Sequence, residues 1–500
     1  MINTITQRRQ VIPRWLSYRA SSLLDAHNLI SSNYNTTRNN GEHVLDDWKK
    51  MPTLDTAAEL VVESMVLKLP PNGAAYDAAW FIKNKAPQSA LLLHELASVF
   101  LEDIPQNDFG QLTQVDNSRS EQIRGLKRTL NSSPLNPIAW SDLSLHYAIQ
   151  GLPNQASKAM TTALALAPTN RFVLRNASRC FLHLNEEERA HDILKKSKLI
   201  GIDPWITSAE IALADTLNLH NIQVKRALSL LENKNFSDHS KSELAIALFT
   251  IESKDEPMRK IRKFLNQSLS APTENSLAQV AWLLRNKKIS AIEFSPNLLK
   301  QVVPLEAEAL RLQNYQQYDL ALNAIKNWEV FQPFCPQPCI MGTYVASVFL
   351  DDNQKALDFF TKTSEVNRHN SMLLNNVAFS CAKLGKVSEA REYVREARKR
   401  MDCNDSEYMK LAVTATDGLI CFRVNDIDKG RQLYQEAVSG FDKMKNSKGI
   451  IGATMASFFW ALEEKRIKSE TSQKILDKAK ERNKKVPSPD FEILLKKYVP

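Results

Sequence analysis

Three side chains that can carry positive charge recur one helical turn apart in the first half of this sequence. Arg175, Arg179 and His183 are spaced by four residues, so on a helix they share one face. Such a row can hold a carboxylate or a phosphate through charge-assisted hydrogen bonds. The alternative is that the arginines are solvated and that acidic neighbours satisfy them, and the spacing leaves both interpretations open.

Two thiols lie close together in Cys335-Pro336-Gln337-Pro338-Cys339. A tetrahedral zinc site requires two more ligands at short spacing, and no partner pair occurs nearby. We therefore favour a proline-rich turn between repeats, with no metal and no cofactor. The six cysteines are scattered, mostly at apolar helical positions, namely Cys180, Cys335, Cys339, Cys381, Cys403 and Cys421. This distribution predicts reduced core residues of a cytoplasmic protein.

Sequence signatures of catalysis are missing. The chain contains no Gly-x-x-x-x-Gly-Lys-Ser/Thr loop, no Gly-x-Ser-x-Gly elbow, no His-Glu-x-x-His motif and no kinase set. Leu384-Gly385-Lys386 is best explained as a tight turn between helices, and His183 and His191 as parts of a solvated helix turn. We expect a protein that is not an enzyme and has no catalytic residues.

A 34-residue pattern of large and small residues must position these side chains. Its clearest copy is carried by Trp140, Leu143, Ser144, Tyr147, Ala156, Met160, Ala163 and Pro168. On these positions the chain resembles the tetratricopeptide repeat (TPR) family. Further copies include one with Ala378 and Ala390, followed six residues late by one with Gly418 and Gly430.

The resemblance implies an all-α fold, an α-solenoid of antiparallel helix pairs wound into a TPR-like superhelix. Small residues such as Ala156 and Ala390 let paired helices approach closely, and stacking builds one continuous core. Glycine is only 13 of 500 residues, and no sustained two-residue alternation occurs, so we expect almost no sheet. Three segments are predicted: an extension at 1–52, repeats at 53–296 and a C-terminal array at 297–500 with a charged capping helix at 469–483.

The N-terminal extension does not fit the repeat. It predicts a short amphipathic helix around Trp15, Tyr18, Leu23 and Leu24, followed by a polar loop. This helix could dock as a cap on the first repeat or serve as a peptide-like arm for a partner. Capping is the preferred interpretation.

In TPR proteins ligands usually lie in the concave groove lined by the first helix of each repeat. The resemblance places eight residues of this chain there: Arg175, Arg179, His183, Asn375, Phe379, Lys383, Phe422 and Arg423. Phe379 and Phe422 could equally be core residues. Only fragments of the family's carboxylate-binding Lys/Asn/Asn/Lys/Arg set are found, so a mixed apolar and polar peptide groove fits better.

The net charge of +9 and the isoelectric point near 9.0 raise the question of nucleic acid. Basic residues mostly alternate with acidic ones, except at Arg398-Lys399-Arg400, Lys484-Lys485 and Lys496-Lys497. We expect a cytoplasmic, non-enzymatic scaffold or regulatory adaptor that holds a partner peptide or helix, without a membrane span. The alternative is a sensor or nucleic-acid-associated subunit of a larger bacterial assembly that binds phosphate through basic patches.

Overall fold

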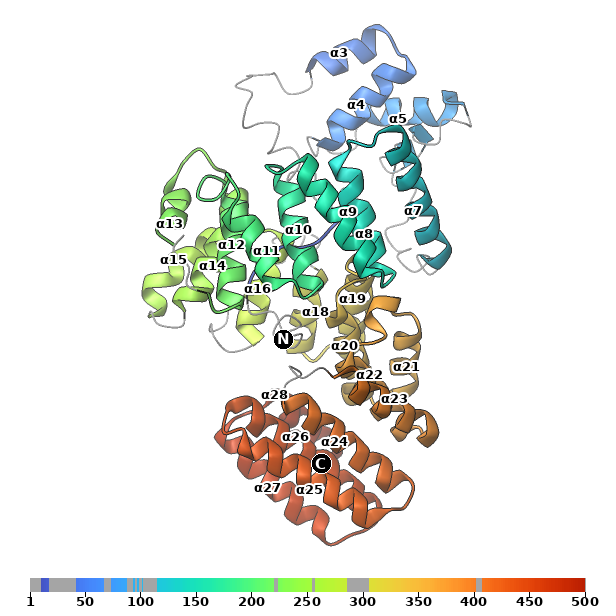
Figure 1. Cartoon of the computed structure of the whole chain (residues 1–500), viewed down its shortest axis with the longest axis vertical. Coiled ribbons are helices and arrows are strands. Elements are labelled where there is room, and N and C mark those ends of the chain that lie inside the picture. Colours follow the sequence, from blue (N-terminus) through green and yellow to red (C-terminus); the bar gives the residue numbers. More distant parts are fainter. Residues whose placement is uncertain are drawn as a thin grey trace. The chain divides into compact units, whose positions relative to one another are not determined.

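The protein is described by a computed structural model that covers residues 10–17, 42–66, 73–87, 93–94, 97–98, 101, 115–219, 224–253, 257–285, 305–401 and 407–499. In these residues the chain forms α-helices, a short π-helix and a short 3₁₀-helix, and no β-strand (Figure 1). The prediction of an all-α chain is confirmed.

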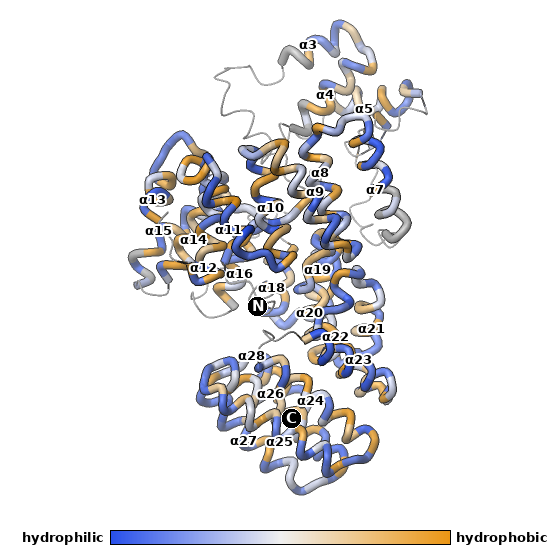
Figure 2. The backbone as a smooth tube through the Cα atoms, in the orientation of Figure 1, coloured by the Kyte–Doolittle hydropathy of each residue, from blue (hydrophilic) through white to orange (hydrophobic). Residues whose placement is uncertain are grey.

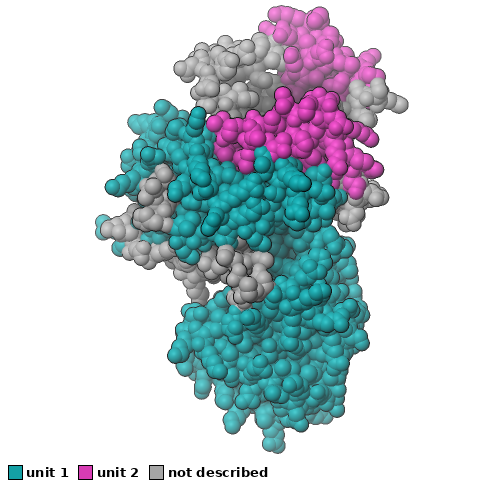
Figure 3. All heavy atoms as spheres, viewed as in Figure 1, with its two compact units in different colours: residues 1–15, 144–161, 175–500 teal, residues 16–143, 162–174 magenta. Residues whose placement is uncertain are grey.

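The helices fall into two compact units (Figure 3). Unit 1 comprises residues 1–15, 144–161 and 175–500, and unit 2 comprises residues 16–143 and 162–174. The division passes through α8 (Pro137–Ile149), α9 (Pro153–Leu166) and α10 (Arg171–His183). The boundaries predicted at residues 52 and 296 stay predictions, and residue 296 lies outside the described part of the chain.

Unit 2 contains α3 (Glu42–Lys50), α4 (Leu54–Val66), α5 (Gly73–Lys85) and α7 (Val115–Ser132). Helix α4 packs against both α3 and α5. The ring of Trp48 lies 5.2 Å from that of Phe81, and the buried face of α5 is formed by Ala75, Ala78, Ala79 and Ile82. These small residues allow the close packing of helices that the alanines of the sequence predict.

Unit 1 continues after α10 with helices arranged in pairs. Their bounds are α11 (Glu187–Lys195), α12 (Pro204–Thr216), α13 (Val224–Glu232), α14 (Asp238–Glu252), α15 (Met258–Ser270), α16 (Glu274–Arg285), α18 (Leu305–Asn314), α19 (Tyr318–Phe331), α20 (Pro336–Tyr344), η2 (Val345–Phe349), α21 (Asn353–Thr361), η3 (Glu365–Asn367), α22 (Ser371–Lys383), α23 (Val387–Arg400), α24 (Glu407–Arg423), α25 (Ile427–Lys443), α26 (Ser447–Arg466), α27 (Thr471–Lys485) and α28 (Pro489–Tyr498). Helix α14 packs against α15, α18 against α19, α22 against α23, α24 against α25, and α26 against α27. The first helix of a pair also contacts the first helix of the next, as in α12 with α14, α14 with α16 and α16 with α18. The first helices therefore form one row from α12 to α18, and the contacts of α20 with α22, α22 with α24 and α24 with α26 form a second row.

The turns inside the pairs show the repeat most directly. In eight helix pairs a residue with positive φ stands between the two helices: Gly151, Asn185, Asn218, Gln316, Asp351, Gly385, Asn425 and Lys468. At Asn185 the amide of Glu186 donates to the carbonyl of Phe181 at 2.8 Å, which satisfies an open carbonyl at the helix end. Gly151 and Asn185 are 34 positions apart, and Gly385 and Asn425 are 40 apart. The late copy in the sequence therefore follows an insertion of six residues.

Small residues bring the paired helices close together. The Ser144 hydroxyl donates to the carbonyl of Ala156 at 2.7 Å, which joins α8 to α9. A Cβ atom on Gly430 would lie 2.6 Å from the ring of Phe422 and 3.1 Å from the carbonyl oxygen of Gly418. Hydrophobic and hydrophilic positions alternate along the helices (Figure 2), as expected when one face of each helix is buried.

Three local expectations can be compared with the structure. The helix predicted around Trp15 is wrong at that residue, because residues 11–17 belong to no helix. Tyr18, Leu23 and Leu24 lie outside the described residues. The predicted capping helix at 469–483 corresponds to α27, but α28 follows it, so α27 is not the last helix.

Candidate functional site

The first described segment of the chain is non-helical and largely buried. Along residues 10–17 the alternate residues Val11, Pro13 and Trp15 are buried, as is Gln10, and the other residues are partly exposed. Proline supplies no amide hydrogen and disfavours helical geometry at the residue before it, which explains why no helix forms here. We refer to residues 10–15 as the groove segment.

Polar side chains of unit 1 bind the start of the groove segment. The Gln10 amide donates to the carbonyl of Ala247 at 3.1 Å and to the carboxylate of Asp215 at 3.4 Å. The Asn275 amide donates to the carbonyl of Ile12 at 3.0 Å. The bond from Asn275 is made to the backbone of the segment, so it does not depend on which side chain residue 12 carries.

Arg14 is held by two carboxylates and an amide. Its Nε and one terminal nitrogen donate to the two oxygens of Glu274 at 2.9 and 3.1 Å, and the same terminal nitrogen donates to Glu306 at 2.5 Å. The other terminal nitrogen donates to Gln332 Oε1 at 3.2 Å. Burial lowers the pKa of Arg14, but the charges of Glu274 and Glu306 outweigh this effect and raise it, so the guanidinium is always charged.

Trp15 fills an aromatic pocket. Its side chain is fully buried, with ring centroids 5.2 Å from Phe334 and 6.1 Å from His183. Burial, together with the positive charge of Arg179, lowers the pKa of His183 to about 3, so the imidazole is neutral at physiological pH. A fully buried side chain of this size contributes about 2–3 kcal/mol of hydrophobic stabilisation.

The partners of the groove segment come from the first helices of successive pairs and from the residues that follow α19. We refer to them as the binding groove: His183, Asp215, Ala247, Glu274, Asn275, Glu306, Gln332 and Phe334. Val11 also belongs to the apolar core that α12 to α16 build. The groove therefore combines an acidic slot, an aromatic pocket and an apolar floor.

Arg175, Arg179 and His183, which were predicted to form a row on α10, lie beside the binding groove. Each of the three side chains has a different environment. Arg175 is buried and forms an ion pair with Glu243 at 2.9 Å, and its guanidinium lies over the ring of Trp205 at 4.6 Å. Arg179 lies over the ring of Phe334 at 5.3 Å, and His183 is the residue that contacts Trp15. Arg175 therefore follows the alternative interpretation, in which an acidic neighbour satisfies the arginine. This ion pair is buried in the protein, however, and is not solvated. The binding of a partner by these residues stays a prediction.

Two of the residues predicted on the C-terminal wall contact neighbouring first helices of the same array. Asn375 is buried and accepts a hydrogen bond from Thr416 at 2.9 Å. The rings of Phe379 and Phe459 lie 5.1 Å apart, which links α22 to α26. Lys383 is partly exposed at the end of α22. This wall thus packs on itself across alternate helices.

Phe422 and Arg423 are the remaining predicted groove residues. Phe422 is 1% exposed and packs in the core 6.0 Å from the ring of Tyr434, so its placement on the groove surface is corrected to the core alternative. Arg423 pairs with the buried Glu463 at 2.6 Å. Both residues stabilise the contact between neighbouring helices.

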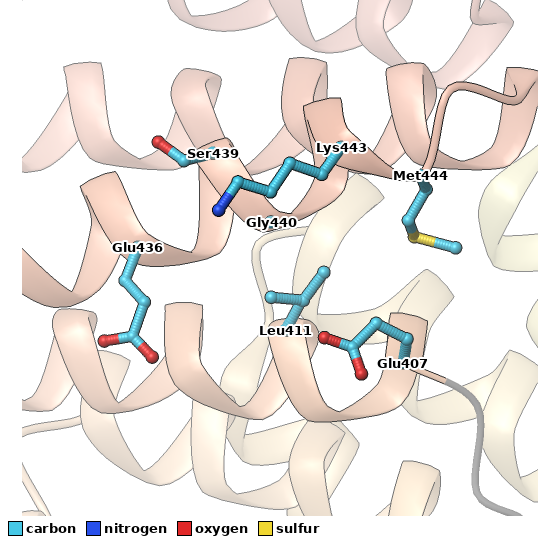
Figure 4. A pocket seen from close by; sticks show the side chains of 7 residues that line it. All are labelled: Glu407, Leu411, Glu436, Ser439, Gly440, Lys443 and Met444. Carbon is cyan, nitrogen blue, oxygen red and sulfur yellow. The ribbon is translucent and has the colours of Figure 1, made fainter.

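A surface pocket of about 460 Å³ lies between α24 and α25 (Figure 4). It is lined by Glu407, Leu411, Glu436, Ser439, Gly440, Lys443 and Met444. Its two carboxylates belong to exposed side chains, and the Lys443 side chain extends along the same face (Figure 4). The pocket does not contain any of the predicted site residues.

The two neighbouring cysteines have a structural role. Cys335 precedes α20 and Cys339 lies within it, so the proline-rich stretch starts a helix rather than forming only a turn. Burial raises the pKa of both thiols, which disfavours the thiolate needed for metal binding or nucleophilic attack. Among the described residues, no group of three or more His, Cys, Asp or Glu side chains has a geometry that could hold a metal ion.

Basic runs at the helix ends are partly neutralised. Arg398 pairs with Asp417 at 2.5 Å and Arg400 with Glu396 at 2.6 Å. Lys497 donates to the carbonyl of Phe349 at 2.8 Å. Binding of nucleic acid by these runs stays a prediction. None of the helices in the described part of the chain is long and apolar enough to cross a membrane.

The sequence reasoning missed the acidic slot and the position of the groove segment. One signal was available, since Val11, Pro13 and Trp15 alternate with a period of two and a proline stands between the hydrophobic residues. Glu274 and Glu306 gave no such signal, because acidic residues in the first turn of a helix are common.

The paired helices and their periodic turns define a TPR-like α-solenoid. No protein-family model matches the sequence, and no curated protein matches it significantly. Among solved structures, the crystal structure of yeast Tom70 is similar over 77% of this chain and 92% of that chain, with 14% identity and a TM-score of 0.35. At this level of similarity the description of the site rests on the residues of the chain itself.

Proposed function

We propose that this chain is a non-enzymatic protein-binding scaffold or regulatory adaptor whose binding groove holds an extended segment of a partner protein. The observation that carries the proposal is the groove segment itself. A non-helical peptide of six residues lies there, with contacts to both its backbone and its side chains. A groove that accommodates this peptide can accommodate another of similar chemistry.

The contacts suit reversible binding of a peptide. Backbone recognition through Asn275 is independent of sequence, while the acidic slot and the aromatic pocket supply specificity. Buried aromatic and arginine anchors usually dominate the energy of such interfaces. The groove segment places Arg14 and Trp15 at these two anchor positions.

A binding experiment on the full-length chain tests the proposal. The variant Arg14→Ala, Trp15→Ala removes both anchors of the groove segment and so frees the groove. A fluorescent peptide spanning Gln10–Ser17 should then bind saturably, as measured by anisotropy. Circular dichroism and thermal melting verify that the variant remains folded.

Matched substitutions locate the binding site. Adding Glu274→Gln and Glu306→Gln should weaken peptide binding at least about tenfold, because the charge-assisted bonds to arginine are lost. Adding Glu436→Gln, an identical change at an exposed carboxylate on α25, should leave binding unchanged. A folded variant that shows no saturable binding, or equal binding in all three backgrounds, would contradict the proposed function.

A further inference from the structure

We infer that the binding groove selects a partner segment in which an arginine is followed directly by an aromatic residue. When no such segment is bound, residues 10–15 of the same chain occupy the groove, and the partner segment binds by displacing them. This inference rests on the proposed function and names the class of partner. The partner is a protein that presents an extended stretch with an Arg-aromatic pair. The occupied groove is thereby the resting state of the scaffold.

The acidic slot requires arginine rather than any cation. Three nitrogens of Arg14 are used at once, on Glu274, Glu306 and Gln332, in the planar fork that only a guanidinium provides. A lysine has a single terminal nitrogen on a flexible stem. It could neutralise one carboxylate, but it could not make the two-point bond to Glu274 and also reach Gln332.

An empty slot would be costly. The side chains of Glu274 and Glu306 are only 16% and 5% exposed, and both contact the same guanidinium. Removing the guanidinium would take three charge-assisted hydrogen bonds from these two buried carboxylates, and such bonds stabilise buried charges. Arg14 supplies them from the same chain, and an arginine of a partner could supply them in its place.

The aromatic pocket selects a ring without demanding a tryptophan. Phe334 and His183 contact the ring of Trp15 at angles of 58° and 61°, the tilted arrangements that aromatic pairs favour. The indole Nε1 of Trp15 is buried without a hydrogen-bond acceptor among the described residues. A phenylalanine at this position would fill the pocket without burying an unsatisfied N–H group.

Covalent attachment explains why the chain's own segment holds the groove. A tethered ligand acts at an effective concentration on the order of millimolar, which can weaken the apparent affinity of a free competitor by about 10²-fold or more. A partner must therefore bind more tightly than the groove segment or arrive in a multivalent form. Substitutions that weaken the binding of the groove segment to the groove should therefore raise the apparent affinity of the protein for a competing peptide.

The test compares the wild-type full-length chain with the Arg14→Ala, Trp15→Ala variant, using the labelled Gln10–Ser17 peptide. We expect the variant to bind it at least about tenfold more tightly than the wild type, since the internal competitor has lost both anchors. On the variant, a peptide with Arg14→Lys should bind at least about tenfold more weakly, because one nitrogen replaces three. A peptide with Trp15→Phe should bind within about threefold of the original, since the pocket contacts only the ring.

The outcomes separate this inference from the proposed function. Equal binding to wild type and variant would overturn the displacement mechanism and leave the peptide-binding function standing. Equal binding of the arginine and lysine peptides would overturn the selection of arginine. Absence of binding to either chain would overturn the proposed function, and this inference with it.

Hydrogen exchange of the wild-type chain provides a measurement that needs no substitution. The backbone amides of Val11 and Ile12, which are hydrogen-bonded in the groove segment, should exchange slowly and become faster when an excess of unlabelled peptide is added. No acceleration at saturating peptide would contradict displacement. A photocrosslinker at position 15, placed in a mixture of heavy-isotope and natural chains, distinguishes crosslinks within one chain from crosslinks between two chains. We expect crosslinks from position 15 to the groove of the same chain. Crosslinks between a heavy and a natural chain would instead identify a second copy as the occupant of the groove.

Discussion

Arg14 and Glu274 lie 260 positions apart in the sequence and form a two-point ion pair, with nitrogen–oxygen distances of 2.9 and 3.1 Å. The pair joins the first described segment of the chain to the first turn of α16. Such a contact closes a very long loop, so it depends on the fold of all the helices between. It also makes the stability of unit 1 sensitive to the removal of one side chain.

Replacing Arg14 with alanine should lower the free energy of unfolding by about 3 kcal/mol, because it removes three charge-assisted hydrogen bonds from the buried carboxylates of Glu274 and Glu306. Chemical denaturation measures the change. The control is Arg395→Ala, which removes an exposed pair with Glu392 and should cost less than about 0.5 kcal/mol. Equal losses in the two variants would show that the buried pair contributes nothing specific.

Gly430→Ala should destabilise the chain by about 1–3 kcal/mol, because the new Cβ would lie 2.6 Å from the ring of Phe422 and the paired helices would have to separate. The matched change Gly125→Ala lies in α7, where no atom stands within 4 Å of a new Cβ. There alanine should stabilise the helix by about 0.5–1 kcal/mol. Opposite signs in thermal melts verify that α24 and α25 require glycine at their contact.

Acidification should weaken the packing around His183. The pKa of this residue is lowered to about 3 in the folded chain, while an unfolded histidine titrates near 6.5. Its contribution is thus fully present above pH 6.5 and is lost as the pH falls toward 3, because the unfolded state takes up the proton. Between pH 6.5 and 4 the melting temperature of wild type should fall further than that of His183→Gln. If the melting temperatures of wild type and His183→Gln fell in parallel, the pKa of His183 would not be lowered in the folded chain.

Glu464 should stabilise the C-terminal pairs at neutral pH. Burial raises its pKa, but hydrogen bonds from Arg431, Ser469 and Trp460 outweigh this effect and lower it to about 2. The stabilisation is complete above pH 4.5 and is lost as the pH falls toward 2, since the unfolded carboxyl binds the proton first. Glu464→Gln should therefore melt at a lower temperature than wild type at pH 7. The difference should shrink below pH 4.5, and a constant difference would argue against an ionised carboxylate.

Much of the fold could be predicted because its signals are local. The pairing of helices follows from residues within one repeat, such as Ser144 and Ala156, and the turns follow from glycine or asparagine at positions like Gly151 and Asn185. That Arg175, Arg179 and His183 share one face of α10 was also predictable from their spacing, while their binding of a partner stays a prediction. Phe422 was ambiguous, because a hydrophobic residue on a first helix can face either the groove or the neighbouring repeat.

The sequence by itself determined the helices, their pairing and their period, since these depend on contacts between residues close together in the chain. Only the tertiary structure decided that Trp15 lies in a buried aromatic pocket rather than on a helix, because its pocket is made by Phe334 and His183. The convergence of Glu274 and Glu306 on one arginine was likewise decided by stacking of successive pairs. The local periodicity of a sequence does not indicate which distant side chains will share a site. The candidate groove could therefore be identified only in the folded chain.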